Sequence, residues 1–279
     1  MKKIILAVTA LCLGMTTWAQ TDSTNKEKAD SINKERADTI KIGGVIIIRK
    51  DGDNNADKKS VIISNKKKPN SVISTNWWIV DIGFTNYNDN TNYGSAGAQS
   101  FAPGMTKENF KLRTGNSVNV NIWLFMQRLR IVKGVNLKYG LGVELNNYHY
   151  DDERVRFSEN PTVVTMDSSY KDLNKNKIAV DYATVPIMLN FNLTPGRKHG
   201  FGFSAGVSAG YRYGSRQKIK DDDRNKLRDD FDLSSWKVSY IGELNLGPVR
   251  LYGSYALQSM WDKGLDQTPY AVGIRLSYL

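Results

Sequence analysis

Residues 201–213 read FGFSAGVSAGYRY, and this stretch decides the fold class. Every odd-numbered position holds an apolar or aromatic side chain, and every even-numbered position holds glycine, serine or arginine. Successive side chains of a β-strand point to opposite faces, so the alternation predicts a strand with one apolar face and one small or polar face. The stretch exceeds the roughly 5–6 residues of a typical soluble strand. A tilted strand needs about 9–11 residues to span a membrane.

Seven further segments from Trp77 onward alternate in the same way, and in the second of the eight we expect Met126 to complete the apolar face. The connections alternate in length: residues 87–115, 149–177 and 217–234 are long, residues 130–134, 195–199 and 247–248 are short, and residues 260–268 are intermediate. Short periplasmic turns and long outer loops are typical of outer-membrane barrels. We therefore expect an all-β fold, an eight-stranded antiparallel transmembrane β-barrel in the outer membrane of a Gram-negative bacterium, with both termini periplasmic.

Aromatic residues gather near the ends of these segments. One group lies at the expected periplasmic ends, namely Trp77, Trp78 and Tyr278. A second group lies toward the outer ends, namely Tyr148, Tyr150, Tyr211, Tyr213, Trp236 and Tyr270. Outer-membrane barrels carry two such girdles at the membrane interfaces, so we expect these rings to face the lipid boundary.

The fourth segment changes phase. Its apolar positions are even-numbered over residues 178–182 and odd-numbered over residues 185–193. Either residues 178–182 extend above the membrane with a different facing, or a bulge near Thr184 and Pro186 shifts the alternation.

The same segment carries a family resemblance. Residues 182–189 read YATVPIML, which resembles the Tyr-Leu-Glu-Ile-Pro-Leu-Leu-Leu signature of PorT-like outer-membrane β-barrel proteins. Tyr182, Pro186 and the aliphatic run match the signature, whereas Thr184 stands in place of its glutamate. The resemblance covers residues 76–279 and implies an eight-stranded barrel domain without supplying an activity.

Charged residues recur on the expected inward faces. We assign eight of them to an interior charge network: Asp81, Lys138, Glu144, Arg212, Lys237, Glu243, Arg250 and Arg275. A charge left unpaired in a narrow interior costs free energy, so we expect these residues to pair. An eight-stranded barrel is only wide enough for side chains to fill. The network is therefore expected to plug the barrel.

The N-terminal part differs in composition. Residues 1–19 combine two lysines, a short apolar stretch and Thr17-Trp18-Ala19, which predicts a secretory signal peptide. Cys12 is the only cysteine and lies inside this segment, so we expect no disulfide in the mature protein. Residues 20–75 are largely charged or polar, and we expect a mostly disordered periplasmic tail.

Three short apolar bursts interrupt this tail, at residues 45–48, 61–63 and 72–73. They predict short β-prone segments. Such segments could dock on an envelope protein or a cell-wall partner by adding a strand to its sheet edge. The alternative is a solvated linker with transient hairpins.

Catalytic and metal-binding motifs are weak. Two overlapping G-x-S-x-G matches lie within residues 202–210, inside an alternating segment and not at the strand-to-helix turn that this motif requires. His149 and His199 have no evident nucleophile or second ligand nearby in the sequence, and the acidic loop over residues 218–232 lacks EF-hand spacing. We expect no catalytic residue, no cofactor and no metal.

The chain carries a formal net charge of +11. For an exported protein, we assign this charge to a surface that faces anionic lipids or cell-wall polymers, and we expect outer-membrane lipid but no nucleic acid as a partner. The leading hypothesis is a non-enzymatic barrel with a structural or interaction role in the cell envelope. The alternatives are a narrow channel or small-solute transporter and, third, a barrel-embedded enzyme.

Overall fold

The computed structural model describes residues 37–42, 45–50, 62–65, 72–158, 161–168, 175–195, 200–220, 224–227, 229 and 231–276. The chain forms two compact units, Met1–Pro69 and Asn70–Leu279. The expected signal peptide, residues 1–19, lies outside the described residues. So do His199, Tyr278 and the acidic run at residues 221–223.

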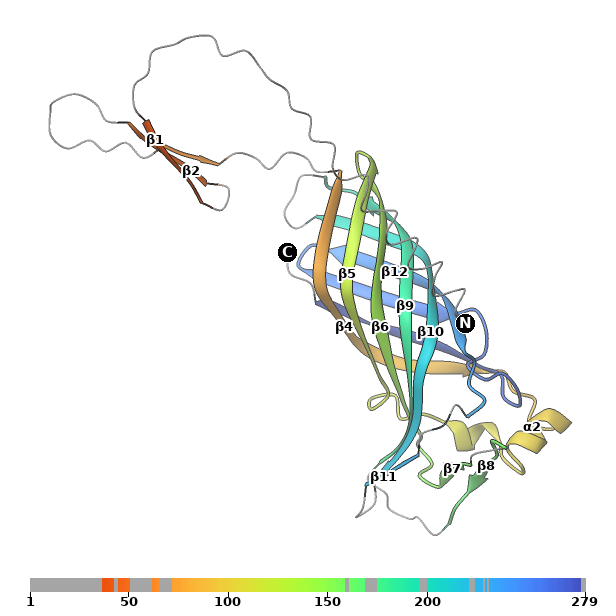
Figure 1. Ribbon diagram of the computed structural model, residues 1–279. Helices are drawn as coiled ribbons and strands as arrows, with labels where there is room; N and C mark the ends of the chain where they lie inside the picture. Colours follow the sequence, from red (N-terminus) through yellow and green to blue (C-terminus); the bar gives the residue numbers. More distant parts are fainter. Residues whose placement is uncertain are drawn as a thin grey trace, which may run out of the picture. The chain divides into compact units, whose positions relative to one another are not determined.

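Eight long strands of the second unit form one closed antiparallel sheet (Figure 1). They are β4 (Ile73–Asp89), β5 (Val118–Val132), β6 (Val135–His149), β9 (Lys175–Asn192), β10 (Phe201–Lys220), β12 (Trp236–Leu246), β13 (Val249–Ala256) and β14 (Gln267–Leu276). Neighbouring strands pair in chain order, and the pairing of β14 with β4 closes the ring. This confirms the eight-stranded antiparallel barrel.

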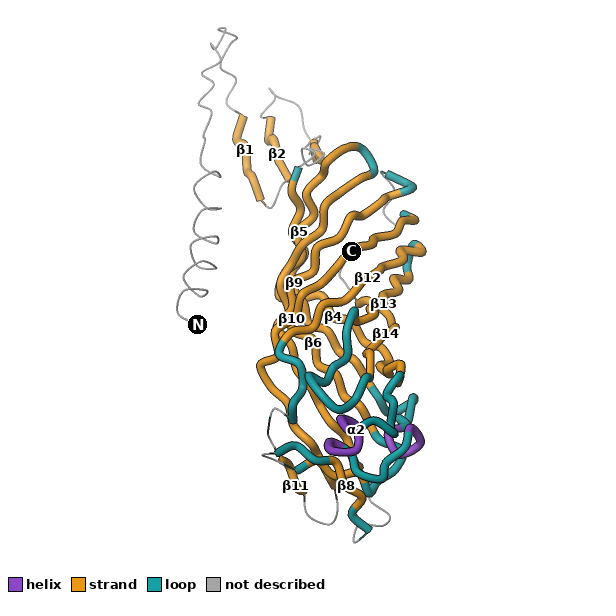
Figure 2. The backbone as a smooth tube through the Cα atoms, turned by 90° about the vertical axis from the view of Figure 1, so that its right-hand side faces the viewer, coloured by secondary structure: helices purple, strands orange, loops and turns teal. Residues whose placement is uncertain are grey.

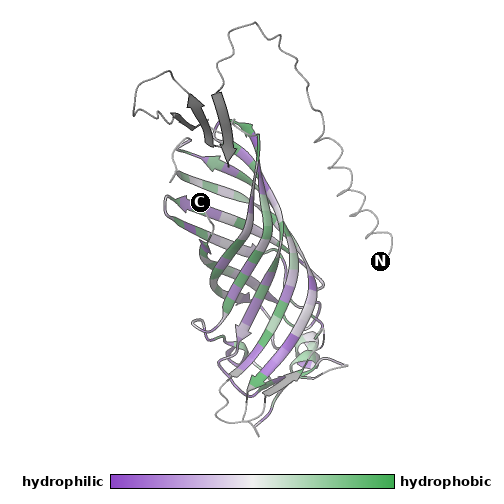
Figure 3. Cartoon of the chain, turned by 60° about the vertical axis from the view of Figure 1, so that its left-hand side comes forward, coloured by the Kyte–Doolittle hydropathy of each residue, from purple (hydrophilic) through white to green (hydrophobic). Residues whose placement is uncertain are grey.

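The wall of the barrel has the reverse polarity of a soluble protein. Outward side chains are large and apolar: Ile82 is 44% exposed and Val272 is 55% exposed. Inward neighbours on the same strands are polar: Asp81 is 0% exposed and Arg275 is 8% exposed. Figure 3 shows the resulting alternation of hydrophobic and hydrophilic residues along the strands. Such a wall suits a hydrocarbon surround, because a soluble protein rarely exposes so large an apolar surface.

One expectation about strand facing was wrong. Met126 is 3% exposed and lies inside the barrel, not on its apolar outer face. The register between β5 and β6 shifts between Trp123 and Phe125. This β-bulge adds one residue to β5, so the alternation reverses beyond it and Met126 turns inward.

The phase change in β9 also has a different cause from either of those expected. Pairing of β9 with β6 keeps one register from Phe191 to Lys177, so the strand has no bulge near Thr184 or Pro186. The even-numbered positions keep the inward phase along the strand, so residues 178–182 do not change facing. What changes is the interior that they meet, because Ile178, Val180 and Tyr182 are buried in a hydrophobic core beyond the polar lumen.

That hydrophobic core belongs to a folded cap at the long-loop end of the barrel (Figure 2). The loops that build it contain α2 (Ala96–Phe101), η1 (Lys107–Phe110), β7 (Val155–Phe157), β8 (Val164–Met166) and β11 (Arg224–Leu227). Tyr148 and Tyr150 are each 1% exposed and belong to this core, so their assignment to an interfacial girdle was wrong. Within the described part of the chain, no helix is long and apolar enough to span a bilayer.

The first unit contains a small antiparallel sheet. Its strands are β1 (Ala37–Ile42), β2 (Val45–Lys50) and β3 (Ile62–Asn65), in the order β1-β2-β3. Two of the apolar bursts therefore overlap strands β2 and β3. The third, residues 72–73, lies at the start of β4, because Ile73 already pairs with Leu129.

Candidate functional site

The barrel interior brings charged side chains from opposite walls together. Asp81 lies on β4, Glu144 on β6 and Glu243 on β12, each at an inward position of its strand. Each is at most 12% exposed in its side chain. A carboxylate so deeply buried needs a cation or several hydrogen-bond donors to offset its lost hydration.

Asp81 receives its cation from the neighbouring strand. Arg275 stands directly opposite Asp81 in the β14–β4 pairing. Its Nε lies 2.6 Å from Oδ1 and its Nη2 lies 2.8 Å from Oδ2, so the pair is bidentate. Trp123 donates from Nε1 to Oδ2 at 2.8 Å. A bidentate pair fixes the orientation of both groups as well as their separation.

Glu243 links this pair to the far wall. Its two carboxylate oxygens bind Arg275 from β14 and Lys138 from β6, and Ser204 on β10 donates to it at 3.2 Å. Side chains from β4, β6, β10, β12 and β14 therefore join in one network. At this level, side-chain contacts across the lumen join different parts of the barrel wall.

A second pair lies nearer to the cap. Lys237 Nζ on β12 lies 2.7 Å from Glu144 Oε2 on β6, and the two side chains are 9% and 6% exposed. The same ammonium lies 5.5 Å from the centroid of the Tyr182 ring, which is a cation–π contact. This pair stands where the polar lumen meets the hydrophobic core of the cap.

Neutral polar groups fill the space between the two charged layers. Asn119 donates to Asn121 and to Asn146, each at 2.9 Å, and it accepts a hydrogen bond from the Tyr252 hydroxyl. The Tyr252 ring fits because the paired residues Gly83 and Gly273 carry no side chain; a Cβ at Gly83 would lie 2.6 Å from its hydroxyl oxygen.

The sequence-based assignment missed the interior roles of Trp123 and Tyr252. Aromatic residues at the strand ends were assigned to the lipid boundary, and these two rings were assigned to neither face. A usable signal was present in the glycines of neighbouring strands, since a Cβ at Gly142 would lie 2.7 Å from the Trp123 ring. Inward glycine leaves room for a large inward neighbour.

The eight expected network residues do not form one cluster. Asp81, Lys138, Glu243 and Arg275 are linked, and Glu144 and Lys237 form a separate pair. Arg212 lies near the cap, where its Nη1 donates to Ser215 Oγ at 3.0 Å. Arg250 lies next to the short turn at residues 247–248, beside Asn245 on the paired strand.

An apolar layer accompanies the charges. Ile79, Trp123, Met126 and Met188 form a buried cluster inside the barrel, and Arg275 lies 5.8 Å from the Trp123 ring centroid. An open aqueous pore would leave interior charges hydrated. Here the interior ion pairs are packed among apolar side chains, so this level of the lumen is filled.

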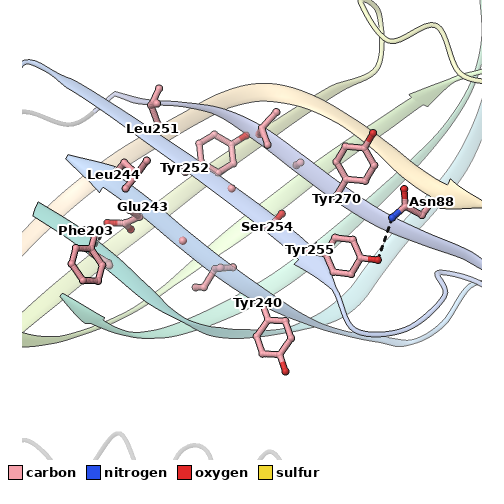
Figure 4. A pocket seen from close by; sticks show the side chains of 16 residues that line it. Asn88, Phe203, Tyr240, Glu243, Leu244, Leu251, Tyr252, Ser254, Tyr255 and Tyr270 are labelled. Atoms are coloured by element: carbon pink, nitrogen blue, oxygen red, sulfur yellow. Dashed lines mark hydrogen bonds between the residues drawn. The ribbon is translucent and has the colours of Figure 1, made fainter. Parts of the chain in front are cut away.

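The outer wall has a groove of its own (Figure 4). Gly242 and Gly253 stand opposite each other on β12 and β13. They leave a hollow of about 860 Å³ that is flanked by Tyr240, Leu244 and Tyr255. Its lining is largely apolar, and Ser204 and Glu243 of the interior network also border it.

The weak catalytic motifs gain no support from the geometry. Residues 202–210 lie within the continuous strand β10, where Ser204 contributes to the Glu243 network. Within the described ranges, no group of three histidine, cysteine or acidic residues could hold a metal ion.

Comparison with solved structures finds distant similarity. Two crystal structures of Ail, the attachment invasion locus protein of Yersinia pestis, are each 10% identical to this chain. One holds the heparin analogue sucrose octasulfate. The matches cover 72% of this chain and 98% of Ail, with TM-scores of 0.31 and 0.30. At such TM-scores, no property of Ail can be transferred to this chain. No curated protein matches the chain significantly.

A family model matches a large part of the chain. The outer membrane protein beta-barrel domain matches residues 76–258, which is more than half of the chain and spans strands β5 to β13 in full. With the closed antiparallel sheet and its apolar outer wall, this match shows that the chain belongs to the outer membrane protein beta-barrel domain family and is a β-barrel of the Gram-negative outer membrane.

Proposed function

We propose that this protein is a closed, non-enzymatic barrel with a structural or interaction role in the cell envelope, and that its folded cap carries the interaction. The observation that carries the proposal is the interior network around Asp81, Arg275 and Glu243, in which the pair of Glu243 with Lys138 joins β12 to β6 across the lumen. These groups fill the barrel where a transporter would need an aqueous path. The proposal therefore ranks above a narrow channel.

The orientation is part of the proposal. Short turns at residues 133–134 and 247–248 lie at one end of the barrel and the cap lies at the other. Short turns are periplasmic in this architecture, which would place the cap outside the cell and both ends of the chain in the periplasm. The PorT-like assignment is likewise proposed, on the resemblance at residues 182–189.

The cap supports an interaction role because its loops are ordered beyond what a barrel requires. Phe157 contacts the rings of Trp261 and Phe231 at centroid distances of 5.5 and 5.8 Å, and Trp261 contacts Phe101 at 5.4 Å. These rings come from the three long loops and the intermediate loop at residues 260–268. Fixing loops into one conformation costs conformational entropy, and a rigid loop surface lowers the cost of binding a partner.

A second interaction site is proposed in the N-terminal unit. The sheet order β1-β2-β3 leaves β1 and β3 as edge strands. An edge strand can accept an added strand from an envelope protein or a cell-wall-associated partner.

Photo-crosslinking in cells tests the cap against the N-terminal unit. A photoreactive amino acid at the exposed cap residue Glu108 should capture a partner, whereas the same group at the wall residue Leu244 should capture lipid. Deleting residues 20–69 leaves β4 whole and should remove only partners of the N-terminal unit. If Glu108 and Leu244 give the same products, the cap is not an interaction surface.

A further inference from the structure

A cavity of about 110 Å³ lies inside the barrel at the short-turn end. Arg250 borders it from β13, just after the turn at residues 247–248, and Lys138 borders it from β6, just after the turn at residues 133–134. Arg275 and Glu243 form its inner wall. Its described lining contains no residue of the cap core, and it shares Ser204, Glu243 and Leu244 with the lining of the outer groove.

The lining of this cavity has an excess of positive charge. Among the described residues, the lining contains four cations, Arg128, Lys138, Arg250 and Arg275, and one carboxylate, Glu243. Deeper in the lumen, Asp81 binds Arg275 and Glu144 binds Lys237. The positive potential of these described lining residues favours an anion over a cation. Low-dielectric walls strengthen such a potential for an anion that enters.

The hydrogen-bonding groups of the lining also fit an oxyanion. Arginine presents a planar fork of N–H donors that matches phosphate and carboxylate oxygens. Asparagine side chains, among them Asn190 and Asn245, complete the wall. Asn245 Oδ1 is buried and has no hydrogen-bond partner among the residues that the structure describes. A protonated phosphate oxygen or a water molecule would supply the donor that this atom lacks.

We infer that this cavity is a binding site for an oxyanion, a phosphate or carboxylate group, that enters from the short-turn end. Arg250 and Arg128 contact the group at the entrance, and Lys138 and Arg275 hold it from the inner side while they remain paired with Glu243. The inference goes beyond the proposed function and does not depend on the cap.

Titration calorimetry of the detergent-solubilised full chain with inorganic phosphate tests the inference at constant ionic strength. The wild-type protein should bind phosphate, and Arg250→Gln should weaken binding about tenfold or more, because one charge-assisted contact is worth roughly 1.5–3 kcal/mol. Arg130→Gln is the matched control. Arg130 is an exposed arginine on β5 at the same end of the barrel, and it is not among the residues that line the cavity. Arg130→Gln should change the affinity less than twofold.

Succinate and vesicles that contain phosphatidylglycerol separate the sources of the anion. Preference for free phosphate or succinate supports a soluble ligand, and preference for the vesicles supports a lipid headgroup. Heat-modifiable migration of each variant on a gel checks that the barrel has assembled. Absence of binding to all three probes would overturn the inference, and so would equal weakening by Arg250→Gln and Arg130→Gln.

Discussion

Lys237 and Glu144 form the most isolated ion pair of the interior, and their side chains are at most 9% exposed. Lys237→Met leaves the carboxylate buried without its cation, which should cost about 3–5 kcal/mol. The double variant Lys237→Met/Glu144→Leu removes both charges and should be more stable than the single variant. Urea unfolding of the detergent-solubilised barrel measures both. A double variant less stable than Lys237→Met would contradict the pairing.

Gly83 and Gly242 differ in the space that each leaves for a Cβ atom. A Cβ at Gly83 would lie 2.2 Å from the Val272 carbonyl oxygen, whereas a Cβ at Gly242 would find its nearest atom at 3.8 Å. Gly83→Ala should therefore lower the fraction of heat-modifiable, folded barrel, with a cost of about 1–3 kcal/mol. Gly242→Ala should assemble as the wild type does. Equal yields would mean that the β14–β4 contact is looser than described.

The inward charged residues could be assigned from the sequence because strand parity fixes the face of each residue. The partners of these charged residues could not be predicted from the sequence. Glu243 binds Lys138 and Arg275 across the lumen, and those contacts depend on how the closed ring brings distant strands together. The inward aromatic residues were missed because a large ring is normally assigned to the lipid face of a barrel.

At the scale of elements, strand alternation predicted the outer wall, and depth in the membrane should set the cost of changing it. Leu141 lies in the middle of β6, whereas Val249 begins β13 beside a short turn. Leu141→Arg should destabilise the barrel by about 2–4 kcal/mol and Val249→Arg by about 0–1 kcal/mol. Urea unfolding measures the loss in free energy of unfolding for each variant. Equal losses would contradict the placement of Leu141 at the membrane midplane and of Val249 at its boundary.

The cap is the second element to test. Phe157→Ala removes the ring that contacts Trp261 and Phe231, a change that typically costs about 3–5 kcal/mol in a core. Limited proteolysis should then cut the long loops faster, while the eight-stranded barrel keeps its heat-modifiable migration. Lys111→Ala, at an exposed cap position, is the control. Loss of barrel assembly in Phe157→Ala would mean that the cap and the barrel fold as one unit.

The cap could not be predicted from the loop sequences. Its buried residues come from four loops and from the ends of β6 and β9, and they meet only because the barrel places these segments in a ring. The bulge between Trp123 and Phe125 also left no sequence signal, because Met126 is equally acceptable on an apolar outer face.

At the scale of the whole molecule, we expect the barrel to be closed by its own side chains. Single-channel recording of the purified full chain in planar lipid bilayers tests this claim most directly, with protein-free detergent as the control. We expect no stable conductance steps, because the buried pairs of Asp81 with Arg275 and of Glu144 with Lys237 occupy the lumen. Large, reproducible steps from the wild-type protein would contradict it.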